Sequence, residues 1–262
     1  MKKVVTLATA ALLLTGLISC KKSNKLVIGA TPVPHVELLN LVKDDLAAEG
    51  VDIEIKEMTD YAVLNEALES GDLDANFDQH IPYMESTNEE KGFHLVNAGG
   101  IHIEPFAVYS KKFSKIEDIP DGATIAIPND PTNEGRSLLL LQSAGLITLK
   151  DGVGLTAVPE DIASNPKNFK FSAIDAATLP KTLEDVDAAT INGNYALDAG
   201  LSAKKDGLFV EGADSPYVNI IAVKSGNEND PRVKALVKAL QSEKVKNYIN
   251  EKYPNGEVVA AF

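Results

Sequence analysis

The sequence has little of what several classes of protein require. Its 262 residues include a single cysteine, so no disulfide bond can form within the chain. Lysine and arginine occur in no run longer than a pair, and the net charge of −13 argues against nucleic-acid binding. There is no GxSxG, no HExxH and no GxxxxGK[ST] phosphate loop. These absences argue against a hydrolase and against a nucleotide site, and we expect no cofactor and no catalytic residues.

The amino terminus carries the clearest compositional pattern. Two lysines precede an apolar stretch over residues 4–18, which is too short to span a bilayer comfortably and is typical of a signal peptide. The tetrad LISC follows, ends at Cys20 and resembles a bacterial lipobox. We therefore predict a signal peptide over residues 1–19, a lipid on Cys20, and a polar tether over residues 20–25. The chain would be anchored to a membrane of the bacterial cell envelope and face the periplasm or the exterior. The alternative is an ordinary signal peptide with an incidental cysteine.

The remaining chain has the pattern of an α/β protein. At 44% hydrophobic and 24% charged residues, it can form one large or two modest soluble domains. Short apolar runs alternate with segments of helical periodicity, which favours parallel βαβ units. Two longer extended runs, residues 101–109 and 217–223, could cross between two lobes that enclose a cleft. Ligands of such folds bind at the carboxyl ends of the strands. Polar residues gather there in segments 78–83, 129–136, 192–195 and 214–219.

One stretch places an arginine where a helix begins. Residues 124–127 are typical of a buried strand, residues 129–135 form a dense turn pattern, and a helical pattern follows. Arg136 lies in or beside the first turn of that helix, where the helix dipole disfavours a cation. One interpretation is that Arg136 and the free backbone N–H groups face one anion, since arginine can grip a carboxylate with two parallel hydrogen bonds. The alternative is a surface arginine that pairs with Glu134 or Asp130.

Several long segments, in a fixed order, match a known family. They are GATPVPHVELL (29–39), DYAVLNEALESGDLDAN (60–76), QHIPYM (79–84), GATIAIPNDPTNEGRSLLLLQSAGLITLKDGVG (122–154), DAATLP (175–180), INGNYA (191–196) and AKKDGLFVEGADSPYVN (203–219). With these motifs the chain resembles the NlpA-type methionine-binding lipoproteins, the substrate-binding components of methionine ABC importers.

The resemblance implies a type II periplasmic-binding-protein fold. In this α/β fold, two lobes joined by two extended crossings close on a ligand in a central cleft. Residues 26–108 and 218–262 would form lobe 1, and residues 109–217 would form lobe 2. The ligand would be methionine or a closely related amino acid or short peptide. The permease and ATPase subunits of an ABC importer would be the protein partners.

The resemblance also implies roles for individual residues. Arg136 looks like the arginine that grips the ligand's carboxylate, and Asn192 and Asn219 look like polar contacts to its backbone groups. This agrees with the residue chemistry, since arginine and amides suit a carboxylate and an ammonium, and aromatic rings suit a thioether. The side-chain pocket would be formed by Tyr61, His80 and Tyr83, with Met58 as a further candidate.

The chain departs from the family at one position. The family usually has an aromatic residue two places before the histidine, in a run such as FQH, whereas this chain has Asp78 there and Phe77 one place earlier. Regular strand alternation predicts that Asn76, Asp78 and His80 share one face. Asp78 could then bond His80 and make the pocket more polar. Alternatively, a local bulge could turn Phe77 into the pocket and send Asp78 to solvent. We expect the second arrangement, which makes Phe77 a candidate ligand-binding residue.

Two other functions stay open from the sequence. The chain contains four histidines, which leaves a metal-binding lipoprotein of an ABC importer as one alternative. None of them has the spacing of a metal site and no histidine-rich loop occurs, so we expect no metal ligands. A cleft enzyme is the second alternative, although the motifs of common hydrolases are missing. The histidines are His35, His80, His94 and His102.

Overall fold

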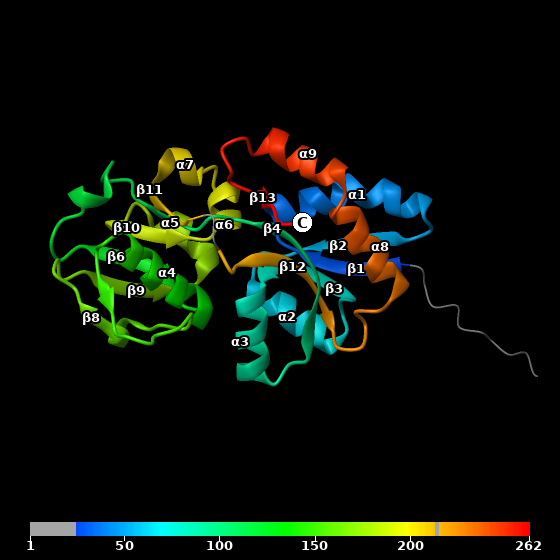
Figure 1. The fold of residues 1–262 in the computed structure, drawn as a ribbon, viewed down its shortest axis with the longest axis horizontal. Helices are drawn as coiled ribbons and strands as arrows, with labels where there is room; N and C mark the ends of the chain where they lie inside the picture. Colours follow the sequence, from blue (N-terminus) through cyan, green and yellow to red (C-terminus); the bar gives the residue numbers. More distant parts are fainter. Residues whose placement is uncertain (1–24, 213–214) are drawn as a thin grey trace, which may run out of the picture.

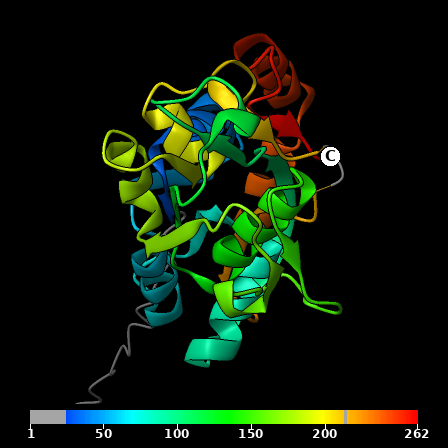
Figure 2. The ribbon, with the colours of Figure 1, turned by 90° about the vertical axis from the view of Figure 1, so that its left-hand side faces the viewer.

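The structure, a computed structural model, describes residues 25–212 and 215–262 (Figure 1). Within them the strands form two large sheets, which lie in separate halves of the molecule, and one small hairpin. Figure 2 shows the molecule with the half that contains the second sheet toward the viewer. The predicted alternation of strands and helices is confirmed. In the described part of the chain, every helix is too short or too polar to cross a membrane. Cys20, the predicted lipidation site, lies outside the described residues.

The first sheet combines parallel and antiparallel strands in the order β13-β4-β12-β3-β1-β2. Strand β1 runs parallel to β2 and β3, whereas β12 runs antiparallel to β3 and β4. Helices α1, α8 and α9 cover one face of this sheet, and α2 and α3 cover the other (Figure 1). The strands are β1 (Lys25–Ala30), β2 (Asp52–Glu57), β3 (Ala75–His80), β4 (Leu95–Ile103), β12 (Val218–Lys224) and β13 (Val259–Ala260). The helices are α1 (Glu37–Ala48), α2 (Tyr61–Ser70), α3 (Ile81–Lys91), α8 (Pro231–Leu240) and α9 (Glu243–Lys252).

The second sheet has the order β11-β5-β10-β6-β9. Strand β6 runs parallel to β9 and β10, while β5 runs antiparallel to β10 and β11. Helix α4 packs on one face, and α5 and α6 pack on the other. The strands are β5 (Ala107–Tyr109), β6 (Thr124–Pro128), β9 (Lys170–Ile174), β10 (Ala188–Ile191) and β11 (Gly207–Val210), and β7 (Thr148–Leu149) pairs with β8 (Ile162–Ser164) in the hairpin. The helices are α4 (Pro131–Ser143), α5 (Leu179–Thr182), α6 (Gly193–Asp198) and α7 (Ala203–Asp206).

The chain passes between the two sheets twice. It leaves the first sheet at the end of β4 and enters the second at β5, and it returns from β11 into β12. Strands β4 and β12 pair with each other, with Ile103 opposite Val218 and His102 opposite Asn219. The two crossings therefore start from neighbouring positions on one antiparallel pair. Strand β5 begins at Ala107, ahead of the predicted lobe boundary after residue 108.

Local hydrogen bonds set the helix starts that border this region. Asp130 caps α4, because its Oδ1 accepts a hydrogen bond from the N–H of Asn133 at 2.9 Å. Pro131 follows at the first helical position, where its missing N–H costs nothing. Asn133 and Arg136 are three residues apart and so lie on one face of the helix. Residue His80 caps α3 in the same way, because its Nδ1 accepts from the N–H of Tyr83 at 3.1 Å.

Strand β3 contains a bulge at Asp78. Ile220 of β12 pairs with Gln79 and Ile221 pairs with Phe77, so Asp78 has no partner residue on β12. Such a bulge inserts one residue and shifts the alternation of side chains. Asn76 and Gln79 consequently share a face, and both bond Asn65 of α2. The bulge that we predicted is present, but the predicted grouping of Asn76 with Asp78 and His80 is wrong.

Candidate functional site

A pocket lies between the two sheets, at strand ends and helix starts. It draws residues from all four polar segments that the sequence analysis named, and from the first crossing. Its cavity measures about 10 Å³, which is about the space that one water molecule needs. An amino acid can therefore enter only when the surrounding elements move apart. The lining residues are Tyr61, Asp78, Gln79, His80, Tyr83, Glu104, Asn133, Arg136, Asn192, Gly193, Asn194 and Asn219.

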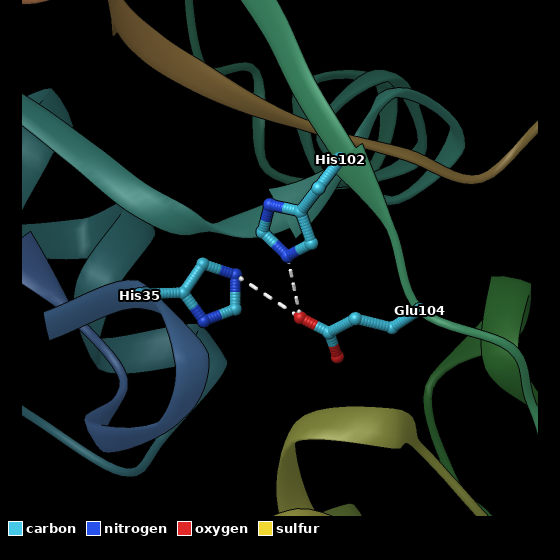
Figure 3. Close-up of side chains that lie close together, drawn as sticks. All are labelled: His35, His102 and Glu104. Carbon is cyan, nitrogen blue, oxygen red and sulfur yellow. Dashed lines mark hydrogen bonds and ion pairs between the residues drawn. The ribbon is translucent and has the colours of Figure 1, made fainter. Parts of the chain in front are cut away.

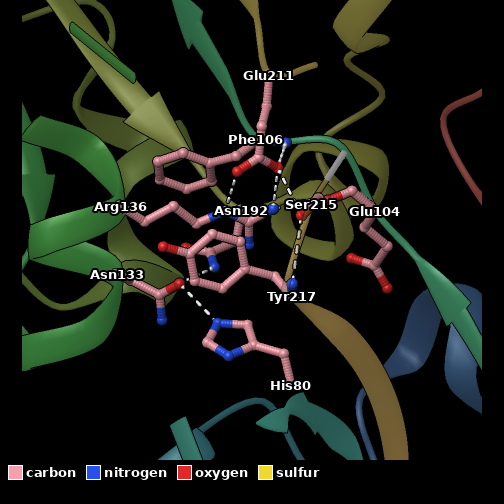
Figure 4. Close-up of polar contacts among 9 residues, drawn as sticks. All are labelled: His80, Glu104, Phe106, Asn133, Arg136, Asn192, Glu211, Ser215 and Tyr217. Atoms are coloured by element: carbon pink, nitrogen blue, oxygen red, sulfur yellow. Dashed lines mark hydrogen bonds and ion pairs between the residues drawn. The ribbon is translucent and has the colours of Figure 1, made fainter. Parts of the chain in front are cut away.

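Arg136 is buried on the second-sheet side of this pocket. The residue is 4% exposed, and its guanidinium lies 4.0 Å from the ring centre of Tyr217 and 4.8 Å from that of Phe106 (Figure 4). The stacking rings hold the plane of the guanidinium, because arginine packs well on aromatic faces. The alternative of a surface arginine paired with Glu134 or Asp130 is therefore wrong.

Arg136 makes two parallel hydrogen bonds to a carboxylate of the protein itself. Its Nε donates to Glu211 Oε1 at 3.0 Å, and its Nη2 donates to Glu211 Oε2 (Figure 4). The same Nη2 donates to the backbone oxygen of Glu104 at 3.0 Å. In the described part of the chain, Nη1 makes no hydrogen bond, so it is the nitrogen left for a ligand while Glu211 stays in place.

A chain of hydrogen bonds fixes the orientation of the polar side chains that face the pocket. Because His80 Nδ1 accepts from a backbone N–H, the ring carries its proton on Nε2, which donates to Asn133 Oδ1 at 3.1 Å (Figure 4). Asn192 Nδ2 donates to the same Oδ1 at 2.9 Å, so Asn192 turns its own Oδ1 away from Asn133. That Oδ1 is buried and has no hydrogen-bond partner among the described residues. Burial lowers the pKa of His80 to about 3, so the ring is neutral near pH 7.

Tyrosines from both halves of the molecule meet across the pocket. Tyr61 of α2 donates its hydroxyl to Asn194 Oδ1 of α6 at 2.6 Å, and Tyr195 donates to the backbone oxygen of Thr59. The ring centres of Tyr61 and Tyr195 are 4.9 Å apart, and those of Tyr61 and Tyr83 are 5.6 Å apart. Together with the bond from His80 to Asn133, these contacts join the two halves in a closed arrangement.

Asp78 lines the pocket, contrary to our expectation that it faces solvent. Its side chain is 3% exposed, and neither carboxylate oxygen has a hydrogen-bond partner among the described residues. Burial raises the pKa of Asp78 well above its usual range, because a low-dielectric site disfavours the charged form. The bulge thus turns this residue toward the ligand site instead of away from it.

Two other predicted site residues lie outside the pocket. Phe77 is 0% exposed and belongs to the core beneath α1, where its ring meets His35 and His102 at 4.6 and 5.4 Å between centres. The prediction that Phe77 replaces the missing aromatic in the pocket is wrong, because the bulge leaves Phe77 on the core face. Met58 packs against the core under α2 and is not among the lining residues. The structure does bring Tyr61, His80, Tyr83, Arg136, Asn192 and Asn219 together around one cavity.

A buried cluster behind the pocket joins two histidines to a glutamate. Glu104 Oε1 lies 2.7 Å from His102 Nε2 and 3.5 Å from His35 Nε2 (Figure 3). Their ligand atoms all lie within 4.8 Å of one another, and two histidines with a glutamate are a donor set that zinc uses. However, both nitrogens of His35 are hydrogen-bonded, one to Thr31 and one to Asn219. These contacts favour a cluster held together by hydrogen bonds over a zinc site. Burial lowers the pKa of His35 to about 4 and of His102 to about 3, and raises that of Glu104.

Several pocket residues were not singled out from the sequence. Asn133 could have been found from its spacing of three residues from Arg136 on one helix, and Asn194 from its place in the INGNYA motif. Glu104 and Glu211 gave no such indication, because each meets Arg136 from a distant part of the chain. They lie next to or within the crossings, whose path the sequence does not specify in atomic detail.

Comparisons with known proteins agree with this geometry. The model of the NlpA lipoprotein family matches residues 26–262. The D-methionine-binding lipoprotein MetQ of Escherichia coli (strain K12) is 46% identical over 211 residues, which cover 80% of this chain and 78% of MetQ. Neither name describes an enzyme.

Solved structures are similar over nearly the whole described chain. A nutrient-binding protein from Burkholderia cenocepacia bound to methionine has a TM-score of 0.87 and 47% identity, covering 90% of this chain and 100% of that one. A periplasmic substrate-binding protein of an ABC transporter from Coxiella burnetii has a TM-score of 0.86 and 42% identity, with coverages of 90% and 100%. The predicted class of fold is therefore confirmed.

Proposed function

The chain belongs to the NlpA lipoprotein family, and from this premise we propose that it is a lipid-anchored solute-binding protein. It captures methionine, or a closely related amino acid or short peptide, between its two halves and delivers it to an ABC importer. Residues 26–108 and 218–262 would move as one lobe and residues 109–217 as the other. Closure of such lobes around a ligand is a common hinge motion.

The observation that carries this proposal is that one pocket contains both a hydrogen-bond donor and a hydrogen-bond acceptor that the described residues leave unused. Arg136 keeps Nη1 for a carboxylate, and Asn192 keeps its Oδ1 for an ammonium. Asn219 lines the same pocket while its Oδ1 bonds His35 at 3.2 Å, so its amide N–H groups are left for the ligand. A free α-amino acid presents these two complementary charges within a few ångströms of each other.

The hydrogen bonds and the lowered pKa of His80 support a role in binding and not in catalysis. A general base needs a free, basic nitrogen within reach of its substrate. His80 uses Nδ1 to accept from Tyr83 and Nε2 to donate to Asn133, and its pKa is lowered to about 3 by burial. We therefore assign it a role in shaping the pocket.

Titration calorimetry of the mature chain with L- and D-methionine tests the proposal directly. We expect one binding site per chain. Ligand should also slow hydrogen exchange at residues 129–135 and 192–195, because closure buries these segments. No heat of binding with either enantiomer, together with unchanged exchange, would contradict the proposed function.

The lipid anchor gives a separate prediction. Cys20→Ala is expected to move the protein from the membrane fraction to the soluble fraction without changing its melting temperature. A lipidated cysteine of this type carries a diacylglycerol, and two acyl chains suffice for stable anchoring. Partition into a detergent phase measures the change, with Ser19→Ala as the control. A Cys20→Ala protein that still partitions like the wild type would rule out lipidation at this residue.

Gly193 gives a prediction about closure. A Cβ added there would lie 2.6 Å from Glu104 Cβ, so Gly193→Ala must push α6 away from the first crossing. Overpacking of this kind costs about 1–3 kcal/mol, which corresponds to a loss of methionine affinity of about 5- to 150-fold. Calorimetry measures the loss of affinity. Gly154→Ala is the matched control, because no atom lies within 4 Å of a Cβ added at that glycine. Equal affinities of the two variants would show that α6 does not need this close approach.

A further inference from the structure

Resting on the proposed function, we propose that Asp78 determines specificity by binding a protonated amine of the ligand that is separate from the carboxylate held by Arg136. The ligand is then an amino acid with a basic side chain, or a short peptide whose amino terminus reaches this residue. Both present the same chemical group, a protonated nitrogen separated from the carboxylate that Arg136 holds.

The first support is that Asp78 is buried without a partner. Neither of its oxygens has a hydrogen bond to the described residues, and the residue is 3% exposed. A buried carboxylate without a partner is strongly unfavourable, and a cationic donor removes that cost. The bulge fixes this orientation, since Phe77 occupies the core face of the strand and Gln79 bonds Asn65 of α2.

The second support is that no neighbouring side chain bonds Asp78. Its electrostatic neighbours are the hydroxyls of Tyr61, Tyr83 and Tyr195. Tyr61 donates to Asn194 and Tyr195 donates to the oxygen of Thr59. The hydroxyl of Tyr83 makes no hydrogen bond to either oxygen of Asp78, so the carboxyl group is left for the ligand.

The third support is the aromatic surrounding. Tyr61 packs against Tyr83 and Tyr195, with ring centres 5.6 and 4.9 Å away. Aromatic rings around a carboxylate form the type of site that binds protonated or quaternary nitrogen, because the ring faces carry negative potential. A thioether would satisfy the rings but would leave both oxygens of Asp78 without a hydrogen bond.

The fourth support is the separation of the two charges. Arg136 of α4 donates to Glu211 and to the backbone oxygen of Glu104. Neither oxygen of Asp78 on β3 bonds any described residue, so no ion pair joins it to Arg136. The two charged groups are therefore left for different parts of one ligand. The nitrogen next to the ligand's carboxylate, an ammonium in an amino acid or an amide N–H in a peptide, has an acceptor of its own in Asn192 Oδ1. The amine at Asp78 is therefore a separate group.

Two pairs of ligands, each differing by one amine, test the proposal by calorimetry. L-lysine is compared with L-norleucine for an amine on the side chain, and glycylmethionine with N-acetylmethionine for the amine of a peptide. We expect the amine-bearing member of one pair to bind wild type at least about tenfold more tightly, because a charge-assisted hydrogen bond to a buried carboxylate is strong. In Asp78→Asn that preference should fall below about threefold, while Asp45→Asn, which changes an exposed carboxylate, should retain it.

The pair that shows the preference identifies the source of the amine. Absence of a tenfold preference from both pairs in wild type, or its persistence in Asp78→Asn, would overturn the assignment of Asp78. Methionine is titrated alongside. If wild type binds methionine while the amine preferences fail, the proposed function stands and this inference alone is wrong. If wild type binds none of the five ligands, both are wrong. Asp78→Asn replaces an unpaired buried carboxyl group by a neutral amide of similar size, so we expect it to fold with a melting temperature no lower than that of wild type.

Discussion

Arg136→Ala is expected to bind methionine about thirtyfold to several thousandfold more weakly than wild type, since truncating one partner of a buried charge pair costs about 2–5 kcal/mol. The residue is 4% exposed and its side chain lies between Phe106 and Tyr217, so water cannot replace the lost donor fully. Arg136→Lys should restore only part of the affinity. A lysine has no planar group that can stack between the two rings, and it cannot engage Glu211 with two parallel hydrogen bonds.

The loss of affinity must be separated from a loss of stability. Removing Arg136 also leaves the carboxylate of Glu211 without its partner, so thermal melting of the ligand-free variant accompanies the calorimetry. Arg232→Ala is the matched control. That arginine also makes a two-nitrogen contact with a carboxylate, Asp230, but it lies at the start of α8, outside the pocket. Near-native methionine affinity in Arg136→Ala would show that this arginine serves the fold and not the ligand.

Phe77→Ala is expected to lower the free energy of unfolding by about 3–5 kcal/mol, the usual cost of truncating a fully buried phenylalanine. For a chain of this size the melting temperature should fall by about 6–20 °C. The ring is 0% exposed and packs between α1 and the sheet, against His35 and His102. Methionine affinity at a temperature where the variant is folded should change little, because Phe77 does not line the pocket.

Thermal and urea unfolding followed by circular dichroism measure this effect. Phe262→Ala serves as the control. That phenylalanine is 38% exposed at the chain end, so its truncation should lower the free energy of unfolding only slightly. A Phe77→Ala variant that melts like wild type but binds methionine poorly would show that the ring faces the ligand after all. The neighbouring Asp78→Asn should have the opposite pattern, with a change in ligand preference and no loss of stability.

Features that depend on local sequence were predictable. The apolar run of β1 and the capping pattern of α2, with Asp60 before it and Gly71 after it, follow from rules that act over a few residues. The alternation of strands and helices gave the α/β class, and polar residues at strand ends pointed to the segments that line the pocket. The role of Asn192 came from the family resemblance, whereas an anion-binding role of Arg136 was already one interpretation of its place at a helix start.

Features that depend on partners far apart in the chain were not predictable. The bulge at Asp78 was predicted, but the directions of Asp78 and Phe77 were not, because they depend on how β3 pairs with β12, a strand whose register no local pattern specifies. The contact between Arg136 and Glu211 joins residues 75 positions apart. His35 reaches Glu104 in the same way, through the packing of α1 on the first sheet. Such contacts are set by tertiary structure, so a pattern read along the chain gives their residue types but not their pairing.

The bulge has a practical consequence for protein engineering. Since residue 78 has no partner on β12, its side chain can be exchanged without altering the pairing of the residues on either side. The core depends on Phe77, and the contact with α2 depends on Gln79, so neither has to change with it. A library randomised at this single position should therefore yield folded sensors with different ligand selectivity. Deleting the residue would instead restore regular alternation, with Phe77, Gln79 and His80 on the faces that they now occupy, and would remove the carboxyl group from the pocket.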